Sequence, residues 1–284
     1  MPRVLIAGCG FVGLATARAL HGAGWDVLGC THAEESARAL EGEPFPVRAA
    51  DLTDPAALLA LGDWRECDAV IHCASSGRGG ADAYRRVYLD GARNLMTALA
   101  PQFLLFTSST SVYAQNDGAW VTEDSPAEPD RETGRILRKA EDLVLRAGGC
   151  VARLAGIYGP GRSVLLKKFL SGEAVIEGDG TRWINQIHRD DIATALALLV
   201  VRGMRGIFNV SDDTPLTQRE VCAWLAAHFA RPLPPTGPIY ASRKRGVTSK
   251  RVSNSRLRAL GWAPRYPSFR DAVTHDPELV AELG

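Results

Sequence analysis

The sequence predicts an α/β protein built on a doubly wound parallel sheet, and three observations support this prediction. Short apolar runs rich in β-branched residues recur in the first half of the chain, at residues 4–7, 25–30, 46–50, 69–75 and 103–107. Segments with helical spacing of apolar residues lie between some of these runs, an alternation typical of parallel strands joined by crossover helices. The first run stops at closely spaced glycines, and a helical pattern follows at once.

The glycine turn is the most informative local feature. Gly8, Gly10 and Gly13 have the spacing G-x-G-x-x-G, with Phe11 and Val12 between the last two. In such a strand–turn–helix, the first glycine permits a tight turn and the second lets a pyrophosphate approach the backbone. The third lets the helix pack closely on the strand, and the helix N-terminus binds the phosphates. Because a strand and a helix flank the glycines, we interpret the turn as the dinucleotide-binding turn of a Rossmann fold.

The bulk properties suit one large or two closely joined domains. The chain has 284 residues, a net charge of +1 and 46% hydrophobic residues. Its longest apolar run, residues 193–201, is too short to span a bilayer. We therefore expect a soluble cytoplasmic protein that binds neither nucleic acid nor membrane. The six cysteines include no C-x-x-C pair, so we expect reduced thiols and no metal site. A basic run at residues 243–245 and 250–251 is interpreted as a solvated face, with contact to a substrate anion as the alternative.

The end of the second predicted strand bears on the choice of cofactor. Proteins that bind NAD commonly place an acidic residue there, which accepts a hydrogen bond from the ribose 2′-hydroxyl. This chain has Thr31 and His32 instead. Since no carboxylate would repel a 2′-phosphate, NADP is favoured over NAD, with His32, Ser36 or Arg38 as its ligands. Alternatively, these are loop residues and the 2′-hydroxyl contacts only water.

Three further strand ends supply candidate ligand contacts, because ligands of doubly wound sheets lie at the carboxyl ends of the strands. In Asp51-Leu52, the carboxylate could accept from the adenine amino group. Small residues follow the fourth strand and should border the nicotinamide, namely Cys73, Ala74 and Ser75. We interpret Cys73 as a small residue beside the cofactor, with a reactive thiol as the alternative. Hydroxyl residues 107–111 end the next strand and could polarise a carbonyl.

With these motifs the sequence resembles the extended short-chain dehydrogenase/reductases, the NAD-dependent epimerase/dehydratase family. The resemblance rests on residues 8–13, 51–52, 72–74, 107–113, 153–162, 185–193, 206–211 and 260–264. It implies a nucleotide-binding domain of residues 1–155 plus about 186–212. A smaller substrate lobe would comprise about 156–185 plus 213–284. It also implies that the chain can form a homodimer.

The resemblance places a catalytic hydroxyl on Ser109, four residues before Tyr113. The family then uses a Tyr-x-x-x-Lys motif on the next helix, where the phenol is the acid/base and the lysine lowers the pKa of that phenol. When Glu141 sets the register, the tyrosine position falls on Thr133 and the lysine position on Leu137. The motif is absent, so the chain is an atypical member of the family.

Three explanations of this absence stay open. In the first, another phenol has taken over: Tyr88, at a position where the family usually has Asn, or Tyr113, with Arg135 supplying positive charge. In the second, the protein binds NAD(P) without turnover, as a sensor or regulator. In the third, it catalyses a reaction that needs little proton transfer, with Ser109 alone or on an unknown substrate.

The resemblance also implies the substrate class. Relatives act on sugar or nucleotide-sugar carbonyl or carbinol groups, as NAD(P)-dependent oxidoreductases or epimerases, and an arginine of the substrate lobe binds the diphosphate. Arginine suits that role because its planar fork makes bidentate contacts with phosphate oxygens. The candidates here are Arg162, Arg182 and His188, with Ser111 beside the catalytic hydroxyl. The alternative for each arginine is a solvated surface position.

Overall fold

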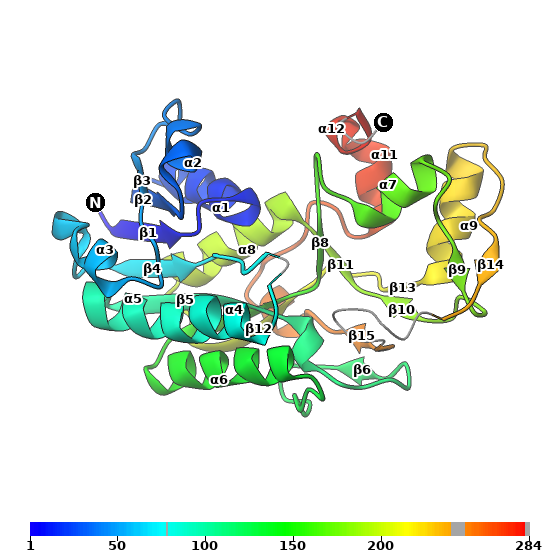
Figure 1. Ribbon diagram of the computed structural model, residues 1–284. Coiled ribbons are helices and arrows are strands. Elements are labelled where there is room, and N and C mark those ends of the chain that lie inside the picture. Colours follow the sequence, from blue (N-terminus) through cyan, green and yellow to red (C-terminus); the bar gives the residue numbers. More distant parts are fainter. Residues whose placement is uncertain (78, 240–247, 282–284) are drawn as a thin grey trace. The chain divides into compact units, whose positions relative to one another are not determined.

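A computed structural model describes residues 1–77, 79–239 and 248–281 of the chain (Figure 1). Its main element is a seven-stranded sheet with the order β12-β7-β5-β4-β1-β2-β3. The strands are β1 (Arg3–Ala7), β2 (Asp26–Thr31), β3 (Val47–Ala49), β4 (Ala69–His72), β5 (Phe103–Ser109), β7 (Cys150–Leu154) and β12 (Gly206–Val210). The pairings from β3 through β5 are parallel. The order of the strands reverses between β1 and β4, which is the switch point of a doubly wound sheet. The predicted fold class is confirmed.

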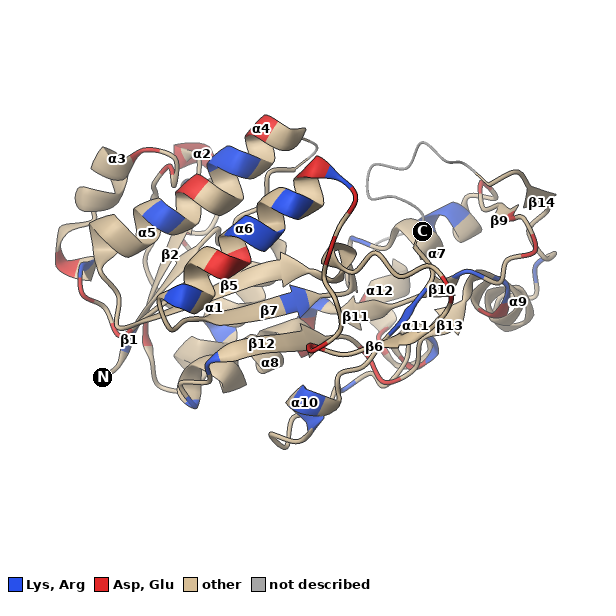
Figure 2. Ribbon diagram, turned by 90° about the horizontal axis from the view of Figure 1, so that it is seen from below, with Lys and Arg blue, Asp and Glu red and all other residues tan. Residues whose placement is uncertain are grey.

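Helices cover both faces of this sheet, as Figures 1 and 2 show together. On one face lie α1 (Phe11–Gly22) and α8 (Arg189–Val201). On the other lie α4 (Ala81–Tyr84), α5 (Gly91–Leu99) and α6 (Glu132–Arg146). Shorter helices connect the first strands, namely α2 (Glu34–Arg38), α3 (Pro55–Leu59) and η1 (Gly62–Trp64). The strands are buried between the helices, and Val4 through Ala7 are fully shielded from solvent.

The helical segment that covers residues 81–99 has an internal irregularity. A π-helical section, η2 (Arg85–Asp90), separates α4 from α5. Local capping follows the sequence: Asp54 caps α3 by accepting from the Ala56 amide at 2.9 Å. Thr217 and Glu220 form a capping box at the start of α9 (Gln218–His228).

The chain divides into two compact units. The first comprises Met1–Val112, Ala127–Arg153 and Ile192–Phe208, and the second Tyr113–Pro126, Leu154–Asp191 and Asn209–Gly284. The second unit therefore contains residues 113–126, 154–155, 186–191 and 209–212, which were predicted to belong to the nucleotide-binding domain. In the second unit, β6 (Trp120–Val121) pairs with β15 (Arg251–Val252), and β11 (Gln186–His188) pairs with β8 (Gly156–Tyr158). These pairings hold residues 113–126 and 186–191 in the second unit.

The second unit has a core of its own. Its other elements are α7 (Val164–Leu170), β9 (Ile176–Glu177), β10 (Trp183–Ile184), β13 (Leu216–Thr217), β14 (Thr236–Gly237), α10 (Ser255–Arg258), α11 (Phe269–His275) and α12 (Pro277–Ala281). Tyr158, Phe169, Leu225 and Phe269 are among its buried core residues. The basic run predicted at residues 243–245 lies outside the described residues.

The cysteine side chains are mostly buried. All six cysteines are free thiols and five are buried. Burial raises the pKa of the Cys9, Cys30 and Cys150 thiols to about 12.

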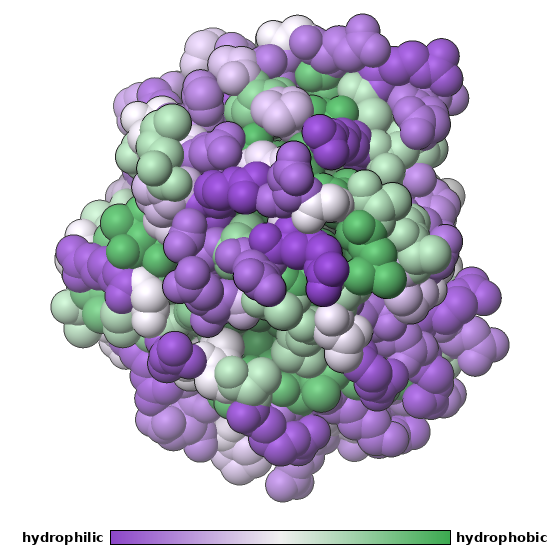
Figure 3. Space-filling view, turned by 90° about the vertical axis from the view of Figure 1, so that its left-hand side faces the viewer, coloured by the Kyte–Doolittle hydropathy of each residue, from purple (hydrophilic) through white to green (hydrophobic). Residues whose placement is uncertain are grey.

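On the face shown in Figure 3, hydrophilic residues are interspersed with small apolar areas. Within the part of the chain that the structure describes, no helix combines the length and the apolarity needed to cross a membrane.

Candidate functional site

The three glycines of the first turn differ in what surrounds them. Gly8 has φ of +95°, and a Cβ there would lie 2.4 Å from the Ala74 backbone. A Cβ on Gly13 would lie 2.2 Å from the Gly8 carbonyl oxygen, whereas a Cβ on Gly10 would meet nothing within 4 Å. Packing within the protein therefore requires glycine at the first and third positions. At Gly10 the backbone faces open space, which is the arrangement that the close approach of a pyrophosphate needs.

Helix α1 begins directly at this turn. It is 12 residues long and has no acidic residue in its first turn, which includes Phe11, Val12 and Gly13. The positive end of the helix dipole and the backbone amides of the first turn favour an anion at this position. The turn and helix together can hold the diphosphate of a dinucleotide.

The ends of β2 and β3 carry the residues expected near the adenosine ribose. The Thr31 side chain is nearly buried and donates to the Ala33 carbonyl at 3.1 Å. The exposed His32 has its Nδ1 3.7 Å from the Asp51 carboxylate. Burial opposes ionisation of Asp51, but hydrogen bonds from Thr53 and the nearby His32 outweigh it and hold the pKa of Asp51 below its usual value. The Leu52 side chain is buried, and its carbonyl accepts a hydrogen bond from Asn94 Nδ2 at 2.9 Å.

The turn after β4 packs directly against the glycine turn. The Cys73 amide donates to the Ala7 carbonyl at 2.8 Å, and the Ala74 backbone lies against Gly8. Ser75 is exposed and accepts a hydrogen bond from the Gly77 amide at 3.2 Å. Burial raises the pKa of the Cys73 thiol strongly, so the side chain stays protonated. This supports the interpretation of Cys73 as a small packing residue and disfavours a reactive thiol.

Tyr88 lies on η2, where it packs on residues of β4 and β5. Its half-buried ring is stacked on His72 with 6.3 Å between ring centroids, and it meets the Phe106 ring edge-on at 6.2 Å. Its hydroxyl oxygen accepts a hydrogen bond from the Ser76 amide at 3.3 Å. Because this contact uses a lone pair, the phenol proton can be donated to another group.

Ser109 ends β5 in a half-buried position. Its Oγ accepts from the Ser111 amide at 3.2 Å, within the turn that starts η3 (Thr110–Val112). The Ser109 hydroxyl can therefore still donate its own proton. Thr107, two residues earlier, donates to the His72 carbonyl at 2.9 Å and joins the ends of β4 and β5.

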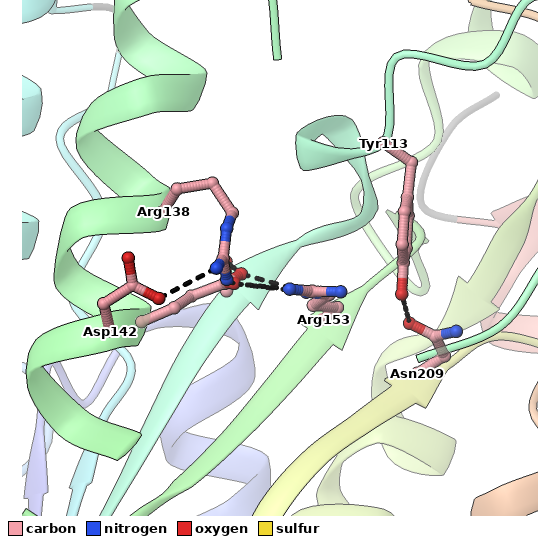
Figure 4. Close-up of polar contacts among 7 residues, drawn as sticks. Tyr113, Arg138, Asp142, Arg153 and Asn209 are labelled. Carbon is pink, nitrogen blue, oxygen red and sulfur yellow. Dashed lines mark hydrogen bonds and ion pairs between the residues drawn. The ribbon is translucent and has the colours of Figure 1, made fainter. Parts of the chain in front are cut away.

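A buried ionic cluster anchors α6 to the sheet (Figure 4). Glu141 accepts from the Ser108 hydroxyl at 2.5 Å and from Arg153 Nη2 at 2.7 Å, and it also pairs with Arg138. Both Glu141 and Arg153 are almost wholly buried, and Asp142 pairs with Arg138 at 2.8 Å. The spacing of residues around Glu141 did not predict this cluster. An arginine inside the buried strand β7 was the signal for a buried acidic partner.

The start of α6 has neither a phenol nor an ammonium group. Thr133 is half-buried in its first turn, and Leu137 is buried. Arg135 is exposed and donates to the Asp130 carbonyl at 2.5 Å. Arg135 is thus bound to the turn that precedes α6. This position gives no support to the hypothesis that Arg135 supplies positive charge to a catalytic phenol.

Tyr113 has a structural position, contrary to the catalytic role considered for it. Its side chain is fully buried in the second unit, and its hydroxyl donates to Asn209 Oδ1 at 2.9 Å (Figure 4). The backbone N–H of Asn209 donates to the Glu123 carboxylate at 2.8 Å. A phenol held in this way inside a core does not reach a substrate, so we assign Tyr113 to the fold.

The substrate candidates of the second unit separate into two kinds. His188 is fully buried, its Nε2 lies 3.1 Å from Asp276, and its Nδ1 accepts from the Asp190 amide at 3.2 Å. Burial lowers its pKa in spite of the two aspartates. With both nitrogens engaged, His188 has a structural position, contrary to the predicted substrate contact.

The two arginines remain candidates. Arg162 is exposed, and its backbone pairs with Gly159 at 2.9 Å in both directions. Arg182 is half-buried, burial lowers its pKa, and its Nε has no hydrogen-bond partner among residues 1–77, 79–239 and 248–281. A buried guanidinium N–H without an acceptor suits an anionic ligand.

The sheet order, the switch point and the glycine turn define an NAD-binding α/β protein of the Rossmann class. The model of the NAD dependent epimerase/dehydratase family matches residues 4–211, and the chain belongs to this family.

Individual relatives agree with this assignment. Protein YeeZ of Escherichia coli (strain K12) is 32% identical over 228 residues, which cover 74% of this chain and 77% of YeeZ. A 3-diazoavenalumate denitrifying reductase of Streptomyces sp. is 29% identical, covering 95% of this chain and 99% of that protein. The fold is similar to that of Thermus thermophilus UDP-glucose 4-epimerase in complex with NAD, with a TM-score of 0.81, 20% identity and coverage of 100% and 99% of the two chains.

Proposed function

We propose that the chain is an NAD(P)-dependent oxidoreductase that acts on a carbonyl or carbinol group of a small polar substrate of the sugar or nucleotide-sugar type. The observation that carries this proposal is the contrast among the glycines of the first turn. Gly8 and Gly13 are crowded by protein atoms, and Gly10 alone faces open space. That contrast fits a dinucleotide backbone lying over Gly10.

The relatives support this class of reaction. The Streptomyces protein, which matches this chain almost end to end, is named a reductase. The Thermus enzyme is named an epimerase of UDP-glucose and was solved with NAD. For this chain, the exposed Arg162 and the half-buried Arg182 are the residues proposed to bind a substrate anion.

The residues of the first unit suggest how the reaction proceeds. A reduced dinucleotide held by the glycine turn would supply a hydride to the carbonyl carbon of the substrate. The Ser109 hydroxyl donates to the substrate oxygen and polarises its bond to carbon. Tyr88 then gives its phenol proton to that oxygen and is reprotonated from solvent. Negative charge that develops on the phenol oxygen is stabilised by the hydrogen bond from the Ser76 amide.

We further propose that NADP is preferred over NAD. The end of β2 has no carboxylate, and the Thr31 hydroxyl is occupied by the Ala33 carbonyl. The exposed side chains of His32 and Arg38 are the groups proposed to bind a 2′-phosphate.

A second candidate function is that of a cofactor-binding regulator without turnover. The observation in its favour is the apolar, buried Leu137 at the position where the family has its lysine. Tyr88 and Ser109 distinguish the two functions, because only an oxidoreductase needs their hydroxyl groups.

The test is to follow loss of dihydronicotinamide absorbance with NADPH and NADH over a panel of keto-sugars and nucleotide-linked keto-sugars. Wild-type protein should turn over at least one class, and Ser109→Ala should be slower by ~10²–10⁴-fold with unchanged cofactor affinity. Cofactor binding with no turnover across the panel would favour the regulator. Failure to bind either dinucleotide would contradict both functions.

A further inference from the structure

The helix that carries Tyr88 is interrupted by the π-helical section η2. The side chain of His72 contacts the backbone of this section. Such sections are rare and often mark functional sites. The Nε2 of His72 lies 3.0 Å from the carbonyl oxygen of Val87, inside this section. The ring reaches this carbonyl beside Gly91, where a Cβ would lie 3.4 Å from Nε2. The imidazole therefore bonds to the main chain of the helix one residue before Tyr88.

The protonation state of His72 is fixed by its surroundings. The side chain is fully buried, and burial lowers its pKa to about 4, so the ring is neutral near pH 7. A carbonyl oxygen can only accept, which requires Nε2 to carry the proton. Nδ1 is then an acceptor, and it has no partner among the described residues. His72 is itself held in place because its carbonyl accepts from Thr107.

The π-helical section determines where Tyr88 points. Successive residues of an α-helix are rotated by ~100°, and a π-helical turn contains an additional residue. If the section became α-helical, Tyr88 would be rotated by roughly that angle relative to one end of the helix. In the structure its ring lies at 25° to the His72 ring, and its hydroxyl reaches the Ser76 amide.

We propose that His72 is a positioning residue for Tyr88: its hydrogen bond to the Val87 carbonyl holds the π-helical section that directs the phenol to the Ser76 amide. The inference rests on the proposed function, in which Tyr88 donates the proton. In this arrangement the Ser76 amide stabilises the phenolate, which is part of what a neighbouring lysine does elsewhere in the family. Without His72, the phenol would lose both its orientation and this hydrogen bond.

Two amide substitutions separate this role from simple packing. In His72→Gln, the side-chain amide nitrogen can replace Nε2 and still donate to Val87. In His72→Asn, the shorter side chain places its nitrogen near the position of Nδ1, so the bond to Val87 is lost. Both variants are polar and neutral, and Asn therefore serves as the matched control for Gln.

The first readout is independent of catalysis. Hydrogen exchange of the Ser76 amide should be slow in wild type and in His72→Gln, and fast in His72→Asn and Tyr88→Phe. The second readout is kcat/KM with NADPH and the keto-sugar or nucleotide-linked keto-sugar that the wild-type protein turns over. His72→Asn and Tyr88→Phe should each lose ~10²–10⁴-fold, the double variant should lose no more than either, and cofactor affinity should be unchanged.

The outcomes distinguish the two proposals. Slow Ser76 exchange and normal turnover in His72→Asn, with impaired Tyr88→Phe, would overturn the positioning role and leave the proposed function intact. Normal turnover in Tyr88→Phe would overturn Tyr88 as the proton donor. In that case, fast Ser76 exchange in His72→Asn would still support the structural link between His72 and Tyr88, and slow exchange would overturn it.

Discussion

The Tyr113 hydroxyl donates a hydrogen bond to Asn209 Oδ1 across 2.9 Å, and both side chains are fully buried. The bond joins residues 96 positions apart in the chain and lies within the second unit. It gives the phenol an internal partner and removes it from the candidates for proton transfer. Of the two tyrosines considered for that role, Tyr88 is the one with a half-buried ring, which packs on His72 of β4 and Phe106 of β5.

Tyr113→Phe should affect stability and leave catalysis unchanged. Removing the hydroxyl leaves the buried Asn209 Oδ1 without its donor, at an expected cost of ~1–3 kcal/mol in the free energy of unfolding. Urea denaturation measures this cost, and kcat/KM should equal that of wild type. A folded Tyr113→Phe protein that has lost turnover would contradict the structural assignment.

Glu141→Gln should be strongly destabilising, because it removes the carboxylate charge that pairs with the buried Arg153. The expected loss is ~3–5 kcal/mol in the free energy of unfolding. Asp142→Asn is the matched control, since Asp142 makes a partly exposed ion pair with the same Arg138 and should cost only ~0–1 kcal/mol. Equal losses in urea denaturation of the two variants would show that the buried cluster adds nothing beyond a surface pair.

Much of the first unit could be predicted from the sequence because its signals are local. The apolar runs predicted at residues 4–7 and 103–107 lie within β1 and β5, and the Asp54 cap depends on an amide only two residues away. The roles of Gly8 and Gly13 also follow from the turn itself.

The features that were missed depend on partners distant in sequence. The π-helical section involves His72, 15 residues from Val87. Asp191 lies in the first turn of α8, but its carboxylate accepts from the amides of Arg265 and Tyr266, which are 74 and 75 residues away. Periodicity and spacing carry no information on such contacts, so the burial of His188 and Tyr113 could not be predicted either.

The buried, neutral His72 should make the free energy of unfolding decrease in acid. Its pKa is about 4 in the native protein and 6.5 when exposed, so between these values the unfolded chain binds more protons. The free energy of unfolding therefore decreases as pH is lowered from 6.5 to 4, by up to ~1.4 kcal/mol per pH unit.

The His72 effect must be measured as a difference between proteins. Asp191, whose pKa burial raises to about 6, contributes a slope of opposite sign between pH 3.8 and 6. His72→Gln removes only the histidine contribution, so its stability relative to wild type should rise as pH falls. Parallel stability curves for the two proteins would contradict a buried neutral His72.

His32→Ala should reduce the preference for NADP. Loss of a charge-assisted hydrogen bond to a phosphate costs ~1.5–3 kcal/mol, or roughly 10–100-fold in affinity. The Kd for NADPH should rise by this factor while the Kd for NADH stays constant, in calorimetric titrations of both proteins. Tighter binding of NADH than NADPH by wild type would contradict the proposed cofactor preference.

Titration of wild type and Gly10→Val with NADPH and NADH tests most directly whether the glycine turn is a dinucleotide site. A Cβ at Gly10 would meet nothing within 4 Å, so Gly10→Val should fold with nearly wild-type stability. It should nevertheless bind the cofactor ~5–150-fold more weakly, the equivalent of a ~1–3 kcal/mol steric cost. Wild type should bind at one saturable site. Failure of wild type to bind either dinucleotide, or equal binding by Gly10→Val, would contradict the account.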